Sequence, residues 1–151
     1  MAANVFNQAL PVALGADHAG YEYKEMLKAL LLEQGWQVED KGTHSLDSVD
    51  YPDFAHPVAL DVESGKAAFG ILVCGSGEGV CITANKHAGI RAALCWNNEV
   101  AQLSRQHNNA NVICIPARFT DESQAKEMVR LFMNTAFEGG RHENRVNKIS
   151  C

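Results

Sequence analysis

The stretch FGILVCGSGEGVCITANK, residues 69–86, decides the fold that this sequence predicts. It opens with a short apolar run that ends at Cys74. A loop with glycine at positions 75, 77 and 79 follows before the spacing becomes helical. A buried strand, a glycine-rich turn and a helix, in this order, are typical of a parallel sheet covered by helices. The stretch therefore predicts a thiol at a strand end, where such sheets bind ligands.

The rest of the chain repeats this alternation of short apolar runs and helical spacing. Further strands are expected at residues 11–16, 36–42, 91–96 and 111–117. Helices are expected at residues 23–31, 52–64 and 98–107, and from a cap at Asp121 to about residue 136. Alternating strands and helices of this kind predict a doubly wound α/β sandwich with a five-stranded parallel sheet. We expect a single domain over residues 1–151, with residues 1–11 as an N-terminal extension.

Composition and charge exclude several classes of protein. A chain of 151 residues can bury roughly 70% of the surface that its unfolded form exposes, so it needs no disulfide or structural metal. The formal net charge of −5 argues against a general affinity for nucleic acid or anionic membranes. No segment approaches the ~20 apolar residues of a membrane span. Five cysteines, an odd number, favour reduced thiols and a cytoplasmic protein.

Polar and reactive side chains follow several of the predicted strands. Because the carboxyl ends of parallel strands meet at one edge, we expect these side chains to converge at one end of the sheet. An Asp–His pair after a strand can also be a helix cap, and a cysteine at a strand end can be a small buried hydrophobic residue. The candidates outside the glycine loop are Asp17, His18, Asp50, Tyr51, His107, Asn108 and Arg118.

The glycine loop does not match the common phosphate-binding motifs. Counted from Gly75, both the NTPase loop and the dinucleotide fingerprint require a glycine where Val80 stands. A cysteine phosphatase would need an arginine at that same position, six residues after Cys74. No two cysteines have the short spacing of a structural zinc site. What remains is a thiol beside backbone N–H groups at a helix N-terminus, which favour a negative oxygen.

Such a thiol could attack an acyl carbon, or it could remove a proton beside a carbonyl while the loop holds the enediolate. The segment EGGRHENRVNK, residues 138–148, favours the second reaction. Arg141 and Arg145 lie four residues apart, so on a helical turn both guanidinium groups could clamp a phosphate, with Arg118 as a third candidate. A solvated terminal helix is the alternative. A non-catalytic phosphate- or nucleotide-binding module also stays open.

Six segments between Val12 and Ser150 carry a resemblance to a known family. In order they are GADHAGYEYK, DKGT, DYPDFA, ILVCGSGEGVCITANKHAGIRAA, SRQHNNANV and EGGRHENRV. They are similar to the motifs of the sugar-phosphate isomerase family, which includes ribose-5-phosphate, galactose-6-phosphate and allose-6-phosphate isomerases. The resemblance implies a Rossmann-like three-layer sandwich. It also implies an aldose–ketose isomerase that needs neither metal nor cofactor and forms a homodimer, or a dimer of dimers, with shared active sites.

The implied reaction interconverts ribose 5-phosphate and ribulose 5-phosphate in the pentose phosphate pathway, with a hexose 6-phosphate as the alternative substrate. The resemblance makes Cys74 the base that moves a proton between C1 and C2. Val80 stands where relatives without that cysteine carry a glutamate, so the chain is of the cysteine type. The resemblance also implies that Ser76 and the amides of Gly75, Gly77 and Gly79 form the hole that holds the enediolate. It implies that His107 opens the sugar ring, that Asn108 stabilises the anion and that Asp17 contacts the sugar. The implied phosphate ligands are His18, Arg118, Arg141 and Arg145, with the last two in the partner's site.

Overall fold

The five strands form one parallel sheet in the order β2-β1-β3-β5-β4, in a computed structural model that describes residues 4–150. The strands are β1 (Val12–Ala16), β2 (Val38–Asp40), β3 (Phe69–Cys74), β4 (Ala92–Leu94) and β5 (Val112–Pro116). The helices are α1 (Tyr21–Glu33), α2 (Pro52–Glu63), α3 (Glu78–Ala84), α4 (Asn98–Asn108), α5 (Glu122–Asn134) and α6 (Arg141–Asn147). This arrangement confirms the predicted doubly wound α/β fold.

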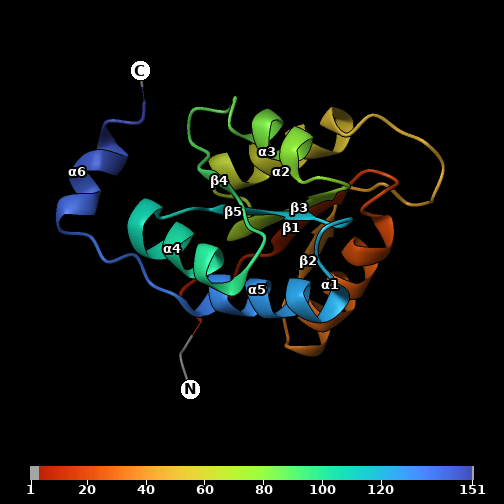
Figure 1. Ribbon diagram of the computed structural model, residues 1–151, viewed down its shortest axis with the longest axis horizontal. Helices are drawn as coiled ribbons and strands as arrows, with labels where there is room; N and C mark the ends of the chain where they lie inside the picture. The colour runs from red at the N-terminus through yellow and green to blue at the C-terminus, as the bar shows by residue number, and fades with distance from the viewer. Residues whose placement is uncertain (1–3, 151) are drawn as a thin grey trace.

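Helices cover both faces of the sheet. Figure 1 shows α1, α4 and α5 on one face and α2 and α3 on the other, while α6 stands out at one end of the molecule. Two separate apolar cores lie between these layers and the sheet. No helix among residues 4–150 is both long enough and apolar enough to cross a bilayer.

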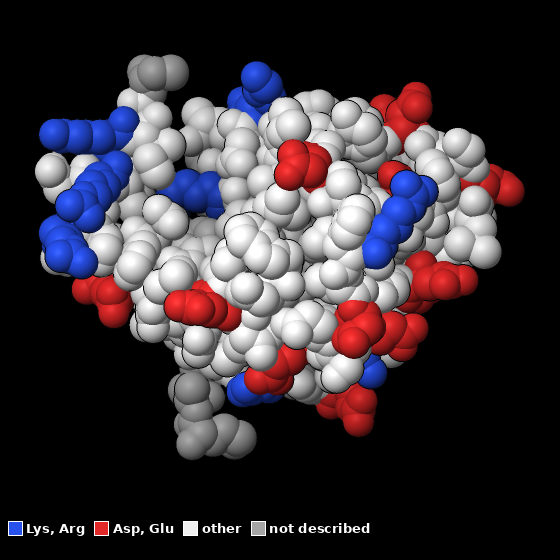
Figure 2. Space-filling view, in the orientation of Figure 1, with Lys and Arg blue, Asp and Glu red and all other residues white. Residues whose placement is uncertain are grey.

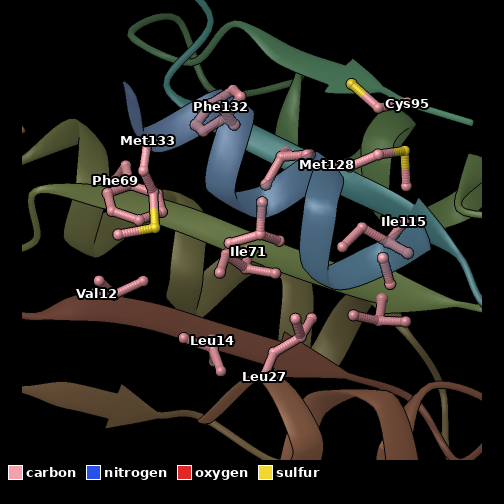
Figure 3. Close-up of a cluster of buried hydrophobic side chains, with 14 of the residues drawn as sticks. Val12, Leu14, Leu27, Phe69, Ile71, Cys95, Ile115, Met128, Phe132 and Met133 are labelled. Atoms are coloured by element: carbon pink, nitrogen blue, oxygen red, sulfur yellow. The ribbon is translucent and has the colours of Figure 1, made fainter. Parts of the chain in front are cut away.

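Alternation along the strands distributes side chains between the two cores. Val12 and Leu14 of β1 enter the core beneath α1 and α5, while Ala13 between them enters the other. In Figure 3, residues of three strands meet Leu27 from α1 and three side chains from α5 in the larger core. The strand residues labelled there are Val12, Leu14, Phe69, Ile71 and Ile115, and the α5 residues are Met128, Phe132 and Met133.

The N-terminal segment packs onto this larger core. The ring of Phe6 lies 4.5 Å from that of Phe69 and 5.6 Å from that of Phe132, measured between centroids. The amide of Val5 donates to the carbonyl of Met133 at 2.8 Å. The described part of the predicted extension, residues 4–11, therefore covers apolar surface of the domain. Residues 1–3 lie outside the described chain.

The two edge strands and α3 are shorter than the sequence predicts. At one edge, β2 ends at Asp40 because its carboxylate accepts the Gly42 amide at 2.9 Å, and the chain then turns through Gly42 with a φ of +100°. At the other edge, the Asn85 side chain donates to the carbonyl of Ala92 and accepts its amide. The Asn85 amide group thus occupies the outer edge of β4 directly after α3 ends at Ala84.

Candidate active site

A cavity of about 340 Å³ opens at the carboxyl ends of β1, β3 and β5. The sheet register explains its position, because Ala16 pairs with Val73 and Cys74 pairs with Pro116, so the residues that follow these strands lie side by side. The cavity also lies where the strand order changes direction, the usual ligand position in open α/β sheets. It is lined by Asp17, His18, Ala19, Tyr51, Cys74, Gly75, Ser76, Gly79 and Arg118.

A second cavity of about 540 Å³ lies beside β4 and α4. It is larger than the first, but its lining is mostly apolar and includes Ala93, Leu94, Leu103 and Ile149. None of the thiol, hydroxyl or carboxyl groups predicted for catalysis lines it. We therefore place the candidate active site in the smaller, polar cavity.

Cys74 is the last residue of β3, and only 5% of its surface is exposed. The loop after β5 fixes the backbone around it, because the Ala117 amide donates to the Cys74 carbonyl at 3.0 Å. The Arg118 amide donates to the Gly75 carbonyl at 2.9 Å. The Arg118 side chain lies against Gly75, where an added Cβ would be 3.1 Å from Nε. These contacts bring a guanidinium group into the cavity beside the thiol.

The glycine loop turns directly from β3 into α3. Gly77 has a φ of +72°, and an added Cβ there would lie 2.5 Å from a methyl group of Leu94, so a larger residue would be strained and crowded. The Ser76 Oγ accepts the Glu78 amide at 3.2 Å. The Ser76 hydroxyl hydrogen is consequently free to be donated to a bound ligand. The ring of Tyr51 packs against Gly79, where a Cβ would come within 2.5 Å of Cζ.

Asp17 and His18 connect β1 to α1. Asp17 is 8% exposed, and its Oδ1 accepts the Gly20 amide at 3.1 Å, so part of its role is to close the turn before the helix. The Val49 amide donates to Nδ1 of His18 at 3.2 Å. In the neutral ring this bond leaves the proton on Nε2, which can donate to an anion. The cavity thus joins a thiol and a hydroxyl to two groups whose N–H donors can bind an anion, His18 and Arg118.

Four other predicted residues do not line this cavity: His107, Asn108, Arg141 and Arg145. His107 stacks on His142 with centroids 4.2 Å apart, and its Nε2 lies 3.7 Å from Glu138 Oε1. Asn108 lines the apolar cavity, and Arg141 and Arg145 lie on α6. Figure 2 shows basic side chains gathered over the end of the molecule that α6 forms in Figure 1. Desolvation, His107 and Arg141 lower the pKa of His142.

The expectation that His107 and Asn108 converge with the strand ends of their own chain was wrong. α4 starts after the carboxyl end of β4 and ends shortly before β5 begins, so its last residues lie at the amino ends of the strands. Gly77 is also absent from the cavity lining, because it packs against β4 and β5. Asp50 does not line the cavity either; its carbonyl accepts the Asp53 amide at the start of α2.

Sequence reasoning missed the cluster of His107, Glu138 and His142. The segment EGGRH, residues 138–142, contains Glu138 and His142, whereas the sequence prediction for this region rested on Arg141 and Arg145 alone. Two glycines with positive φ fold the segment back on itself. The signal in the sequence is an acidic residue four positions before a histidine, with a Gly-Gly turn between them. Together with the earlier His107, this pattern would have predicted the cluster.

The four described cysteines form no disulfide with one another. Burial raises the pKa of Cys95 to about 12 and raises that of Cys114 well above its ordinary value. A hydrogen bond from Cys114 lowers the pKa of Cys81. Cys151 lies outside the described residues.

The fold and the cavity define a doubly wound α/β protein with a thiol and anion-binding groups at the switch point of its sheet. The ribose/galactose isomerase family model matches residues 12–149, and the chain belongs to that family. Ribose-5-phosphate isomerase B of Escherichia coli is 46% identical over 140 residues, covering 93% of this chain and 94% of its own.

Solved structures agree with this assignment. A ribose 5-phosphate isomerase from Thermotoga maritima has a TM-score of 0.91 at 48% identity, over 93% of this chain and 97% of its own. Ribose-5-phosphate isomerase B from Mycoplasma genitalium, solved with bound ribulose-5-phosphate, has a TM-score of 0.91 at 40% identity, over 95% of each chain.

Proposed function

We propose that this protein interconverts ribose 5-phosphate and ribulose 5-phosphate through an enediolate, with Cys74 as the base. The observation that carries the proposal is the single cavity that joins Cys74 and Ser76 to His18 and Arg118. The relatives named as ribose-5-phosphate isomerase B support the substrate, and one of them was solved with ribulose-5-phosphate bound. No metal or cofactor is needed for the proposed chemistry.

In the proposed proton transfer, the Cys74 thiolate removes the proton from C2 of the open-chain aldose. The electron pair of that C–H bond forms the C1–C2 double bond, and the carbonyl π pair moves to the oxygen on C1. The Ser76 hydroxyl and the loop amides stabilise this oxyanion. The electron pair of the C1–C2 double bond then takes the proton back from the thiol at C1. The C2 hydroxyl passes its proton to the oxygen on C1 and becomes the carbonyl, so the product is the ketose.

The phosphate would lie between the His18 ring and the Arg118 guanidinium group. His18 can donate from Nε2 because Val49 occupies Nδ1, and Arg118 offers a planar fork of N–H donors. Asp17, with one oxygen already accepting from the Gly20 amide, keeps the other to accept hydrogen bonds from the sugar hydroxyls. A volume of about 340 Å³ falls within the usual range for small-molecule sites.

We further propose that the active site is completed by a second copy of the chain. The cavity lacks His107, Asn108, Arg141 and Arg145. The roles that we propose for them, in ring opening, anion stabilisation and phosphate binding, require contact with the same substrate. α6 contacts α4 and projects from the body of the molecule (Figure 1), which supports the proposal that the arginines of α6 reach a neighbouring chain. In a two-fold symmetric dimer each chain would supply both halves. We place the enzyme in the cytoplasm, where thiols stay reduced.

Turnover with defined sugar phosphates tests the proposal. We expect ribose 5-phosphate to give ribulose 5-phosphate with a kcat/KM at least tenfold above those for allose 6-phosphate and galactose 6-phosphate. A preference for either hexose phosphate would instead make the protein a hexose-phosphate isomerase that uses the same base. Binding of all three sugars without turnover would identify a non-catalytic module and overturn the isomerase assignment.

A further inference from the structure

Three side chains from two separate segments meet beside the C-terminal end of α4: His107, Glu138 and His142, hereafter the His–Glu–His cluster. One potential ligand atom from each lies within 4.8 Å of the other two. Nε2 of His107 and Nε2 of His142 each lie 3.7 Å from Glu138 Oε1. Two imidazoles and a carboxylate around one point form a ligand set that proteins use for zinc.

The backbone holds this cluster in place. The Glu138 amide donates to the carbonyl of Gln106 at 3.0 Å, which fixes Glu138 beside the residue that precedes His107. Gly139 and Gly140, with φ of +67° and +57°, then turn the chain. The His142 amide donates to the Gly139 carbonyl at 3.0 Å. This turn brings His142 back over His107, so the two rings stack.

We propose that the His–Glu–His cluster binds one divalent transition-metal cation of the Zn²⁺ class per chain. Bonds of about 2.0–2.2 Å to a tetrahedral ion would place neighbouring ligand atoms about 3.4 Å apart. The two observed nitrogen–oxygen distances of 3.7 Å therefore need to shorten by only a few tenths of an ångström. Mg²⁺ and Ca²⁺, which prefer oxygen ligands, would bind far more weakly.

Metal binding requires a small rearrangement of the two rings. They lie nearly parallel, with 12° between their planes, and the lone pair of an imidazole nitrogen lies in the plane of its ring. The rings must tilt toward each other before both nitrogens can point at one ion. The side chains of His107 and Glu138 are 40% and 53% exposed, which leaves room for that tilt and for a water as fourth ligand.

The site would have a consequence for catalysis, and this part rests on the proposed function. A cation bound to His107 removes the imidazole that is proposed to act on the ring oxygen of the sugar. Zn²⁺ would then inhibit conversion of ribose 5-phosphate by occupying a residue of the reaction, although the reaction itself uses no metal. The binding site and the inhibition can be tested separately.

The experiment measures binding of the metal alone to the full-length protein. Calorimetric titration with Zn²⁺ gives affinity and stoichiometry, and the absorption spectrum of the Co²⁺-loaded protein shows whether thiolate takes part, through intense near-ultraviolet charge-transfer bands. The variants are Glu138→Gln and His142→Ala. The matched control is Glu143→Gln, because Glu143 is an exposed glutamate of the same segment that lies outside the cluster. Circular dichroism verifies that each variant folds.

We expect one Zn²⁺ per chain, a Co²⁺ spectrum without thiolate bands, and at least tenfold weaker binding in both cluster variants but not in the control. Binding that is absent, that is equal in all variants, or that shows thiolate bands would overturn the metal site. In the activity measurement, inhibition by Zn²⁺ should shift to at least tenfold higher concentration in Glu138→Gln. Metal that binds the cluster without inhibiting would leave the site standing and would contradict the proposed role of His107.

Discussion

Cys74 sits at the end of β3 with its backbone fixed by the loop after β5, so a smaller side chain can replace the thiol without disturbing the strand. The other described thiols are placed differently. Cys114 is fully buried on β5, and Cys81 on α3 donates to the carbonyl of Ala92 at 3.4 Å. At the residue scale, position therefore distinguishes the proposed base from the structural cysteines.

Replacement of Cys74 by alanine should remove catalysis and spare binding. We expect Cys74→Ala to lower kcat by at least about 10²-fold, since it removes the base but leaves His18 and Arg118 in place. The measurement is ribulose 5-phosphate formation, together with calorimetric binding of the sugar phosphate. Cys81→Ala is the matched control and should keep its activity. A Cys74→Ala enzyme with near-native kcat would contradict the proton-transfer assignment.

Replacement of His107 by alanine should separate ring opening from proton transfer. If His107 acts only on the furanose, the variant must wait for the sugar to open spontaneously. Its rate on ribose 5-phosphate should then level off as enzyme concentration rises, while its rate on ribulose 5-phosphate, which has no furanose ring, should rise in proportion. The measurement is the initial rate with each of the two substrates over a wide range of enzyme concentration. Proportional rates in both directions would argue that His107 does not open the ring.

At the element scale, local sequence signals predicted most of the architecture. The Asp121 side chain accepts the Gln124 amide at 2.7 Å and caps α5 as expected, and Gly35 and Gly65 follow α1 and α2 with positive φ. The lengths of the edge strands could not be predicted from local patterns. They depend on side chains outside the strand, such as that of Asn85, which bonds the backbone of β4. The position of His107 is different, because it follows from the predicted topology. A helix between two parallel strands ends where the next strand begins, so the last residues of the predicted helix 98–107 belong at the amino ends of the strands.

Arg105 joins α4 to its surroundings. It is 5% exposed, donates to the carbonyls of Thr135 and Ala110 and lies over the ring of Phe6 at 4.6 Å. Burial and the charge of Arg91 lower its pKa to about 10. Loss of this side chain would leave buried carbonyls without donors.

Arg105→Ala should therefore lower the free energy of unfolding by about 2–4 kcal/mol. The change in the free energy of unfolding is measured by denaturant unfolding of both proteins at the same concentration. The control is Arg130→Ala, because Arg130 forms an exposed ion pair with Glu127, and we expect that change to cost at most about 0.5 kcal/mol. If the two variants proved equally stable, the assigned role of Arg105 would be wrong.

Asp40 couples stability to pH at the edge of the sheet. Burial alone would raise the pKa of Asp40, but hydrogen bonds from Lys24, the Gly42 amide and Lys28 outweigh it and lower the pKa below the ordinary value of 3.8. A carboxyl group with a lowered folded pKa stabilises the fold above its unfolded pKa, and this contribution is lost as pH falls through the folded value.

The destabilisation caused by Asp40→Asn should thus be large at pH 7 and shrink as the pH falls below about 3.8. Unfolding free energies of the native protein and the variant, compared at each pH, isolate this contribution. Asp47→Asn, a change at an exposed position, should show little effect at any pH. A cost for Asp40→Asn that stays constant down to pH 2 would rule out this linkage.

At the scale of the whole molecule, the proposed site residues of one chain lie in two groups at different ends of the sheet. The first group is Cys74 with the glycine loop, His18 and Arg118, and the second is His107 and Asn108 with the arginines of α6. The sequence predicted both sets of residues through its motifs. Their separation within a chain follows from the parallel topology, because α4 runs from the carboxyl end of β4 back to the amino end of β5.

The central claim is that a second copy of the chain brings these two groups together, and a mixed dimer tests it most directly. One chain carries Cys74→Ala and the other carries Arg141→Ala with Arg145→Ala; different tags allow the mixed dimer to be purified. In a shared-site dimer, one site holds both lesions and the other holds neither. We predict that each parent is nearly inactive and that the mixed dimer recovers about half of the native activity. A purified mixed dimer as inactive as its parents would contradict the shared site.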